Sequence, residues 1–314
     1  MELFRRITFA TFLLLPFSNY AQSTDSLPVQ KSVIFQKIKD TAHNQLIILY
    51  KNKKTTFDSR GALYFVRYLP NDMWQLAKSP FEKSNLKGLI AVAASTAILI
   101  PFDQSLLKNV QDASKKINLS EDNHYGVAWG IGKTKIIKYP RNFNAALYQL
   151  GEGGTSLVLA GGLWVYGKIQ KDYRAVQTAG DLAETFIVMG VGTQILKRIS
   201  GRESPFMATK KNGAWRPFPS FKEYADHTSK YDAFPSGHLA TMMATVTTLA
   251  LDYPEKKWIR PVGYSLMALT SWAMVNSEVH WISDYPLALA IGYLSGKIST
   301  MRHIKKPSII NTDL

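Results

Sequence analysis

Apolar residues gather in six runs from residue 88 onward, and polar connectors separate these runs. The runs cover residues 88–102, 155–166, 182–196, 239–251, 262–275 and 286–298. No useful length of chain alternates apolar and polar residues with the period of two that indicates a strand. The pattern therefore predicts an all-α fold, a helical bundle of about six core helices.

The beginning of the chain follows a different pattern. Arg5 and Arg6 precede the apolar run Phe9–Phe17, and small and polar residues follow it up to Ala21. This order is typical of a secretory signal peptide, so we expect residues 1–21 to be a cleaved signal. An uncleaved membrane anchor is the alternative, although the run is short for a membrane span. Either alternative predicts export.

The chain after the signal divides into two parts. Residues 22–87 are mixed and polar with no clear period, so we expect an irregular N-terminal extension with some amphipathic helix. Residues 88–314 contain all six apolar runs and are long enough to bury a substantial core. We therefore predict one helical domain in this second part.

The apolar runs leave the relation to a membrane open. Most runs are shorter than the roughly 18 to 20 residues that a membrane span requires, which favours buried core helices. Basic residues, however, cluster at 168–174, 256–260 and 297–306. If the helices crossed a membrane, these clusters would lie on one side of it, as the positive-inside rule expects. A cleaved signal followed by six spans would put these clusters on the outer side. We therefore predict a periplasmic, membrane-associated bundle, with an integral membrane protein as the alternative.

Charge and composition narrow the classes of partner. The chain has 38 Lys and Arg residues against 23 Asp and Glu, a net charge of +15, so its surface attracts anions. The sequence has no zinc-ligand spacing, no helix-turn-helix signature and no interleaving of basic and aromatic residues. It therefore argues against a nucleic acid as the partner. The absence of cysteine excludes disulfides and thiolate nucleophiles. We expect a phosphorylated lipid or a small phosphate ester as the partner, together with membrane association.

His280 and Asp284 form the first candidate pair. They are four residues apart, so in a helix they would lie on one face and the carboxylate would accept a proton from the imidazole. Such a carboxylate makes the other ring nitrogen a better nucleophile or base. An isolated pair of this spacing is more often an ordinary helix start, so the interpretation depends on the other motifs.

The segment Pro235-Ser-Gly-His238 stands where the apolar run 239–251 should begin a helix. Ser236 is a good N-cap, Gly237 allows a ligand to approach the backbone, and the free N–H groups of a helix N-terminus bind anions. His238 would then lie beside such an anion as a candidate general acid. A capped helix start with an exposed histidine is the alternative.

Lys197 and Arg202 follow the run 182–196, at the predicted C-terminus of a helix. The helix dipole alone favours cations there. The functional interpretation is that both neutralise phosphoryl oxygens during phosphoryl transfer. One such segment could occur at a helix end by chance. The occurrence of all three in one chain, each at a different helix end, is much less expected by chance.

This ordered trio resembles the type 2 phosphatidic acid phosphatase and vanadium haloperoxidase superfamily, whose pattern is K-x6-R-P, then P-S-G-H, then S-R-x5-H-x3-D. The resemblance covers roughly residues 145–300. The roles that it implies are a nucleophile at His280, an orienting carboxylate at Asp284, a general acid at His238, and phosphate binding by Lys197 and the backbone of Ser236 and Gly237.

Two positions depart from the family pattern. Ser204 replaces the arginine before Pro205, and Met274 replaces the arginine of the third motif. Each lost charge-assisted hydrogen bond to a buried anion is worth about 1.5 to 3 kcal/mol, so a replacement is needed. We expect Arg202, with Arg216 as the weaker candidate, to supply the missing positive charge.

The resemblance implies a phosphatase that acts on phosphate monoesters or diphosphates, either lipid or isoprenoid phosphates or small phosphate esters, through a phosphohistidine and without a metal cofactor. The same superfamily contains haloperoxidases, in which the imidazole binds vanadate, so a haloperoxidase with a vanadate cofactor is an alternative. A degenerate member that binds a phosphorylated ligand or serves only a structural role is a third hypothesis, which the two missing arginines motivate.

Overall fold

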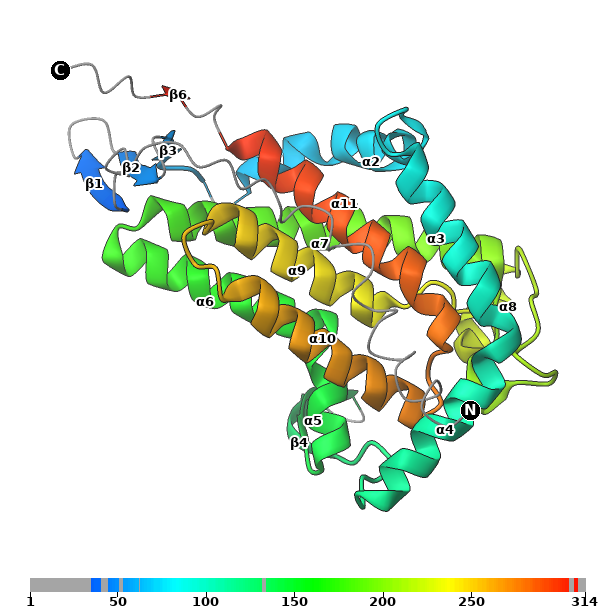
Figure 1. Cartoon of the computed structure of the whole chain (residues 1–314). Helices are drawn as coiled ribbons and strands as arrows, with labels where there is room; N and C mark the ends of the chain where they lie inside the picture. Colours follow the sequence, from blue (N-terminus) through cyan, green and yellow to red (C-terminus); the bar gives the residue numbers. More distant parts are fainter. Residues whose placement is uncertain are drawn as a thin grey trace, which may run out of the picture.

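A computed structural model describes residues 35–40, 45–50, 53–61, 63–131, 134–304 and 308–309. The predicted signal peptide lies outside these described residues. The larger helices, shown in Figure 1, are α2 (Leu69–Lys78), α3 (Leu86–Leu99), α4 (Asp103–Lys116), α5 (Phe143–Leu150), α6 (Gly153–Gln170), α7 (Tyr173–Ser200), α9 (Gly237–Asp252), α10 (Ile259–Asn276) and α11 (Tyr285–His303), with the short α8 (Phe221–Asp226) between α7 and α9.

Helices α7, α9 and α11 form the centre of the bundle, with α6 and α10 packed outside them (Figure 1). Small residues let α11 approach α9 closely, because a side chain at Gly292 or Gly296 would collide with the α9 carbonyl groups of Ala240 or Ala244. The main core contains large apolar side chains from these helices and from the segments that connect them, including Leu239, Met243, Met274, Trp281 and Ile291. This close packing gives the helix ends defined positions.

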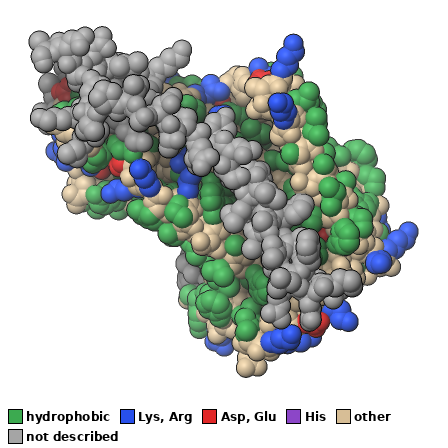
Figure 2. Space-filling view, in the orientation of Figure 1, with side chains coloured by type: hydrophobic (Ala, Val, Ile, Leu, Met, Phe, Trp, Pro, Cys, Tyr) green, Lys and Arg blue, Asp and Glu red, His purple; other side chains and the backbone are tan. Residues whose placement is uncertain are grey.

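The six apolar runs each lie within or largely within a helix, which confirms the predicted helical fold. The first run differs from the expectation of a core helix, since none of the residues of α3 is buried. Ile90 and Ile98 are instead among the exposed large apolar residues. Figure 2 shows hydrophobic side chains gathered over α3 on the outer face of the molecule. Helix α3 therefore covers the bundle loosely and presents apolar surface outward.

The N-terminal extension is more regular than the sequence predicted. It contains the strands β1 (Gln36–Asp40), β2 (Gln45–Tyr50) and β3 (Lys53–Asp58), which pair in order as an antiparallel sheet with the short β6 (Ser308–Ile309). Leu46 and Ile48 on β2 and Phe57 on β3 are buried together. The period of two is present here, but over a strand of only six residues. A second hairpin joins β4 (Tyr125–Ile131) to β5 (Thr134–Pro140).

Within the described residues, one continuous helical stretch, 86–116, has the length and composition of a membrane span. It joins α3 to α4 through a short 3-10 turn, η4 (Ile100–Phe102), which contains Pro101. Only 6% of its most apolar window is buried. One such helix is weak evidence for a span, and the apolar portion coincides with the exposed α3.

Candidate active site

The fold brings the three sequence motifs together at one end of the bundle. Lys197 lies in the last turn of α7, and the segment 235–238 begins α9. The rings of His238 and His280 are 5.9 Å apart between centroids, at 71° to each other. The Lys197 ammonium lies 3.9 Å from the point where a Cβ on Gly237 would stand. Residues more than 80 positions apart in the chain therefore share one site.

The N-terminus of α9 is built as the sequence predicted. Ser236 is the N-cap, and its hydroxyl accepts a hydrogen bond from the backbone N–H of Leu239. The Ser236 N–H donates to the backbone carbonyl of Asp284 at 3.2 Å, which ties the cap to the third motif. The first N–H groups of a helix have no partner within it, so they are available to an anion beside Lys197.

The segment from His280 to Asp284 is not the helix that its spacing suggested. It is an irregular stretch followed by the 3-10 turn η7 (Ile282–Asp284), and α11 begins only at Tyr285. His280 Nδ1 nevertheless lies 3.4 Å from Asp284 Oδ2, although the two are not aligned as a hydrogen bond. Such contacts are often long before substrate binds. Asp284 Oδ2 is held by the Trp281 N–H at 2.8 Å.

Both histidines are neutral; His280 is buried and His238 is partly exposed. Burial, with the Lys197 ammonium as the next cause, lowers the pKa of His280 to about 3. Burial and the neighbouring His280 and Lys197 likewise lower the pKa of His238 to about 3. A neutral imidazole has the lone pair that a nucleophile needs. His238, in contrast, must gain a proton before it can act as an acid, and a bound anion would favour that proton.

Sulfate is expected to bind more tightly as the pH falls from about 8 to about 5, by up to about tenfold per pH unit. The dianion raises the pKa of His238, so binding takes up a proton, and proton uptake makes binding stronger at lower pH. Calorimetric titration at several pH values measures this dependence. The slope should become smaller in His238→Gln, with the remainder due to His280; an unchanged slope there, or none in the wild type, would contradict the assignment.

Arg202 has partners other than the predicted phosphate. Its guanidinium is fully buried (0% exposed) and donates to Asp284 Oδ1 at 2.6 Å and to Asp103 Oδ2 at 2.7 Å. The rings of Trp215 and Trp281 lie 4.8 and 5.5 Å from it. Arg202 thus holds the carboxylate that faces His280, which makes it a positioning residue in this structure.

Asp103 is the site residue that sequence reasoning missed. It accepts from Arg202 and from both the backbone N–H and the hydroxyl of Ser283, one residue before Asp284. Asp103 begins α4, in a part of the chain that carries none of the three motifs. An aspartate at a helix start is ordinary in a sequence, so no local signal marked it.

The structure also places the remaining predicted cations and Met274, one of the two departures from the family pattern. Arg216 pairs with the buried Glu203 and donates to the Thr209 hydroxyl at 2.9 Å, so its charge is already matched. Met274 is completely buried, with its sulfur 3.7 Å from the Ser236 hydroxyl. An apolar side chain thus occupies one of the positions where the family pattern has an arginine. Lys197, which lies 3.4 Å from Asp232, remains the cation beside the α9 N-terminus.

Comparison with known proteins agrees with this arrangement. Residues 178–306, which contain all three motifs, match the sequence model of the PAP2 superfamily. A lipid A 1-phosphatase of Porphyromonas gingivalis is 32% identical over 68 residues, which is 21% of this chain and 15% of the relative. The chain thus matches only a small part of that relative's length. No solved structure matches the chain significantly.

Proposed function

We propose that the protein is a phosphatase that hydrolyses phosphate monoesters or diphosphates through a phosphohistidine at His280. The match of residues 178–306 to the PAP2 superfamily supports this proposal. One observation carries the proposal: the neutral rings of the buried His280 and the partly exposed His238 face each other beside Lys197 and the N-terminus of α9. This arrangement supplies a nucleophile, an acid and an anion site without requiring a metal.

The geometry suggests how the proposed reaction divides between side chains. Nδ1 of His280 faces Asp284, so Nε2 is the nitrogen that attacks phosphorus. Lys197 and the N–H groups of Gly237 and His238 would stabilise the charge on the phosphoryl oxygens. As the phosphorus–oxygen bond to the leaving group breaks, His238 would give that oxygen a proton. Neutral His238 would then take a proton from the water that hydrolyses the phosphohistidine.

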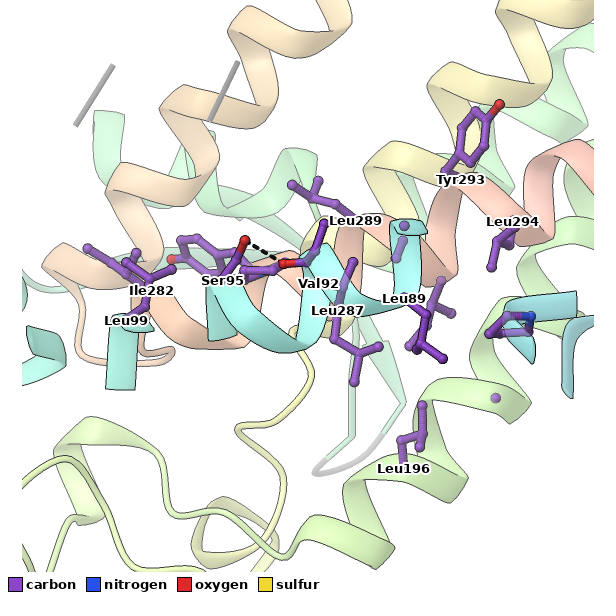
Figure 3. A pocket seen from close by; sticks show the side chains of 18 of the residues that line it. Leu89, Val92, Ser95, Leu99, Leu196, Ile282, Leu287, Leu289, Tyr293 and Leu294 are labelled. Atoms are coloured by element: carbon purple, nitrogen blue, oxygen red, sulfur yellow. Dashed lines mark hydrogen bonds between the residues drawn. The ribbon is translucent and has the colours of Figure 1, made fainter. Parts of the chain in front are cut away.

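An apolar cavity supports a lipid or isoprenoid phosphate over a small ester. It has a volume of about 1580 Å³ and lies between α3, α4, α7 and α11. Figure 3 shows leucine and other apolar side chains that line it, among them Leu89, Leu196 and Ile282. Ile282 and Tyr285 form part of its wall and flank Asp284. The volume exceeds the roughly 300–1000 Å³ of a usual small-molecule site, and so has room for hydrocarbon chains.

The similarity to a lipid A 1-phosphatase points to the same substrate class. The exposed apolar residues of α3, which forms one wall of this cavity, would bring the protein to a membrane surface where such a lipid resides. We therefore propose an exported, membrane-associated phosphatase. Phosphate release from lipid and water-soluble phosphate esters, with no added metal, tests the proposal; no release from any of them would overturn it.

The lipid assignment predicts an effect confined to long-chain substrates. Val191 lies on α7 and lines the cavity, so Val191→Trp should fill space that a hydrocarbon chain needs. Loss of about two methylene contacts, at about 0.8 kcal/mol each, is expected to lower kcat/KM for a long-chain lipid phosphate by about tenfold. A short-chain ester should be hydrolysed as before.

The matched control is Val158→Trp, because Val158 lies on α6, is exposed, and does not line the cavity. It should leave the rates for both substrates unchanged. Equal losses for the long and short substrates in Val191→Trp, or no loss for either, would contradict a role of this cavity in binding the chain.

A further inference from the structure

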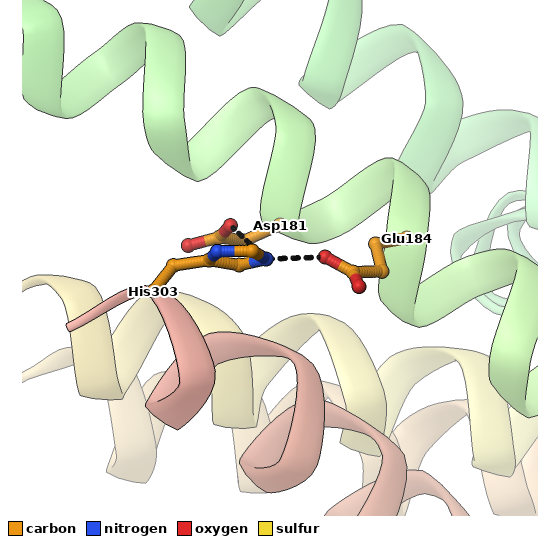
Figure 4. Close-up of side chains that lie close together, drawn as sticks. All are labelled: Asp181, Glu184 and His303. Atoms are coloured by element: carbon orange, nitrogen blue, oxygen red, sulfur yellow. Dashed lines mark hydrogen bonds and ion pairs between the residues drawn. The ribbon is translucent and has the colours of Figure 1, made fainter. Parts of the chain in front are cut away.

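A second cluster of ionisable side chains lies near the other end of α7. Asp181 and Glu184 on α7 meet His303, the last residue of α11, as Figure 4 shows. All three are buried. Asp181 and Lys197 are 16 positions apart on one helix, about 24 Å along its axis at ~1.5 Å per residue. The cluster is therefore separate from the candidate active site.

The three side chains offer one nitrogen and two carboxylates at short range. His303 Nε2 is 2.7 Å from Glu184 Oε2 and 3.9 Å from Asp181 Oδ1. All three ligand atoms lie within 4.8 Å of one another. A divalent ion with ligands at about 2.0–2.2 Å places neighbouring ligand atoms roughly 3–3.5 Å apart. Small side-chain rotations would reach that spacing.

Negative charge exceeds positive charge around the cluster. Four carboxylates are buried here: Asp72, Asp181, Glu184 and Asp252. Two arginines contact this group, since Arg302 pairs with Asp72 and Arg60 meets His303. Two further arginines lie nearby: Arg67 is exposed to solvent, and Arg174 is already paired with Glu255 and the backbone carbonyl of Asp252. Two negative charges are therefore left to be neutralised by two protons or by one divalent cation.

Buried oxygen atoms that accept no hydrogen bond also indicate that positive charge is missing from the cluster. Gln177 shares a face of α7 with Asp181, its amide nitrogen lies 3.5 Å from Asp181 Oδ2, and its carbonyl oxygen is buried without a partner. Both carboxylate oxygens of Asp252, which is 1% exposed, also lack a donor. Buried acceptors of this kind require a partner.

We propose that Asp181, Glu184 and His303 bind one divalent transition-metal ion, with Zn²⁺ and Mn²⁺ as the best-fitting ions. An imidazole together with carboxylates suits these ions, whereas Ca²⁺ and Mg²⁺ prefer sites made only of oxygen ligands. Rotation of the Gln177 amide, whose nitrogen lies 3.5 Å from Asp181 Oδ2, would offer its unpartnered carbonyl oxygen as a further ligand. The site joins α7 to the end of α11, so its role is to stabilise this end of the bundle.

Arg60 controls whether His303 can act as a ligand. Its Nη1 lies 3.0 Å from His303 Nδ1, and a guanidinium can only donate. His303 Nδ1 therefore accepts, and Nε2 carries the proton that is donated to Glu184 Oε2 at 2.7 Å. A metal ion bound at Nε2 displaces that proton, and the neutral imidazole then carries its one proton on Nδ1. Nδ1 can no longer accept from Arg60, so Arg60 turns away. Arg60 thus competes with the metal.

The test is metal binding by the purified full-length protein, which needs no assay of activity. Elemental analysis of the protein as purified, and calorimetric titration of chelator-treated protein with Zn²⁺ or Mn²⁺, should each give one equivalent. Saturation should raise the Tm by roughly 5 °C or more. Glu184→Gln and His303→Gln should weaken binding by at least about tenfold, and Arg60→Gln should strengthen it by about tenfold.

Two controls keep the result decisive. His227→Gln removes an exposed histidine and should leave the amount of bound metal at one equivalent. Ca²⁺ and Mg²⁺ should not raise the Tm as Zn²⁺ or Mn²⁺ does. If Glu184→Gln and His303→Gln fail to fold, metal binding by the wild type and by Arg60→Gln still tests the proposal. A wild type that binds neither ion, or Arg60→Gln that binds no more tightly, would overturn the proposal.

Discussion

His280→Ala is expected to lower phosphate release by about three orders of magnitude or more, from lipid and water-soluble esters alike. His280 is 3% exposed and is the ring beside which Asp284, Lys197 and His238 converge. Without Nε2 there is no atom to form the covalent intermediate, and alanine leaves the other groups in place. Phosphate release by the purified wild type and variant, without added metal, measures the effect.

His227→Ala is the matched control, since His227 is exposed and outside the site. It should release phosphate at the wild-type rate, and circular dichroism should show that both variants fold. Full activity in His280→Ala would rule out the phosphohistidine. A wild type that releases no phosphate from any ester would instead favour a haloperoxidase or a non-catalytic phosphate-binding role.

Arg202→Met is expected to lower the free energy of unfolding by about 3–5 kcal/mol and to remove activity at the same time. Arg202 is fully buried between Asp103 and Asp284, so its loss leaves two buried carboxylates without their cation. The carboxylate facing His280 is then free to take up a proton and to turn. Burial already raises the pKa of Asp284 to about 6, against the opposing effect of Arg202. Chemical denaturation and phosphate release measure the two effects.

Lys197→Gln provides the comparison that separates a positioning residue from one that contacts phosphate. Lys197 lies beside the N-terminus of α9, so its loss should lower kcat/KM with a much smaller change in stability. If Arg202→Met were as stable as the wild type and only raised KM, Arg202 would be a phosphate ligand, as the sequence first indicated.

Local patterns in the sequence determined six of the helices and the start of α9. The apolar runs predicted six helices, because burial of one helix face needs only residues close together in the chain. The Ser236 cap and the start of α9 followed from side chains within three residues of each other. The same pattern missed β2, because two buried residues in a six-residue strand are too short a signal.

Packing between distant segments decided the rest. The histidine motifs were visible in the sequence, but the partner of Arg202 was not: Asp103 precedes it by 99 residues and carries no motif of its own. The spacing of Asp181 and Glu184 can be read from one helix, whereas His303 joins them only because α11 packs against α7. The spacing of apolar residues along the sequence indicates which face of a helix or strand is buried. Which charges meet in the interior depends on how the elements pack, and only the tertiary structure contains that information.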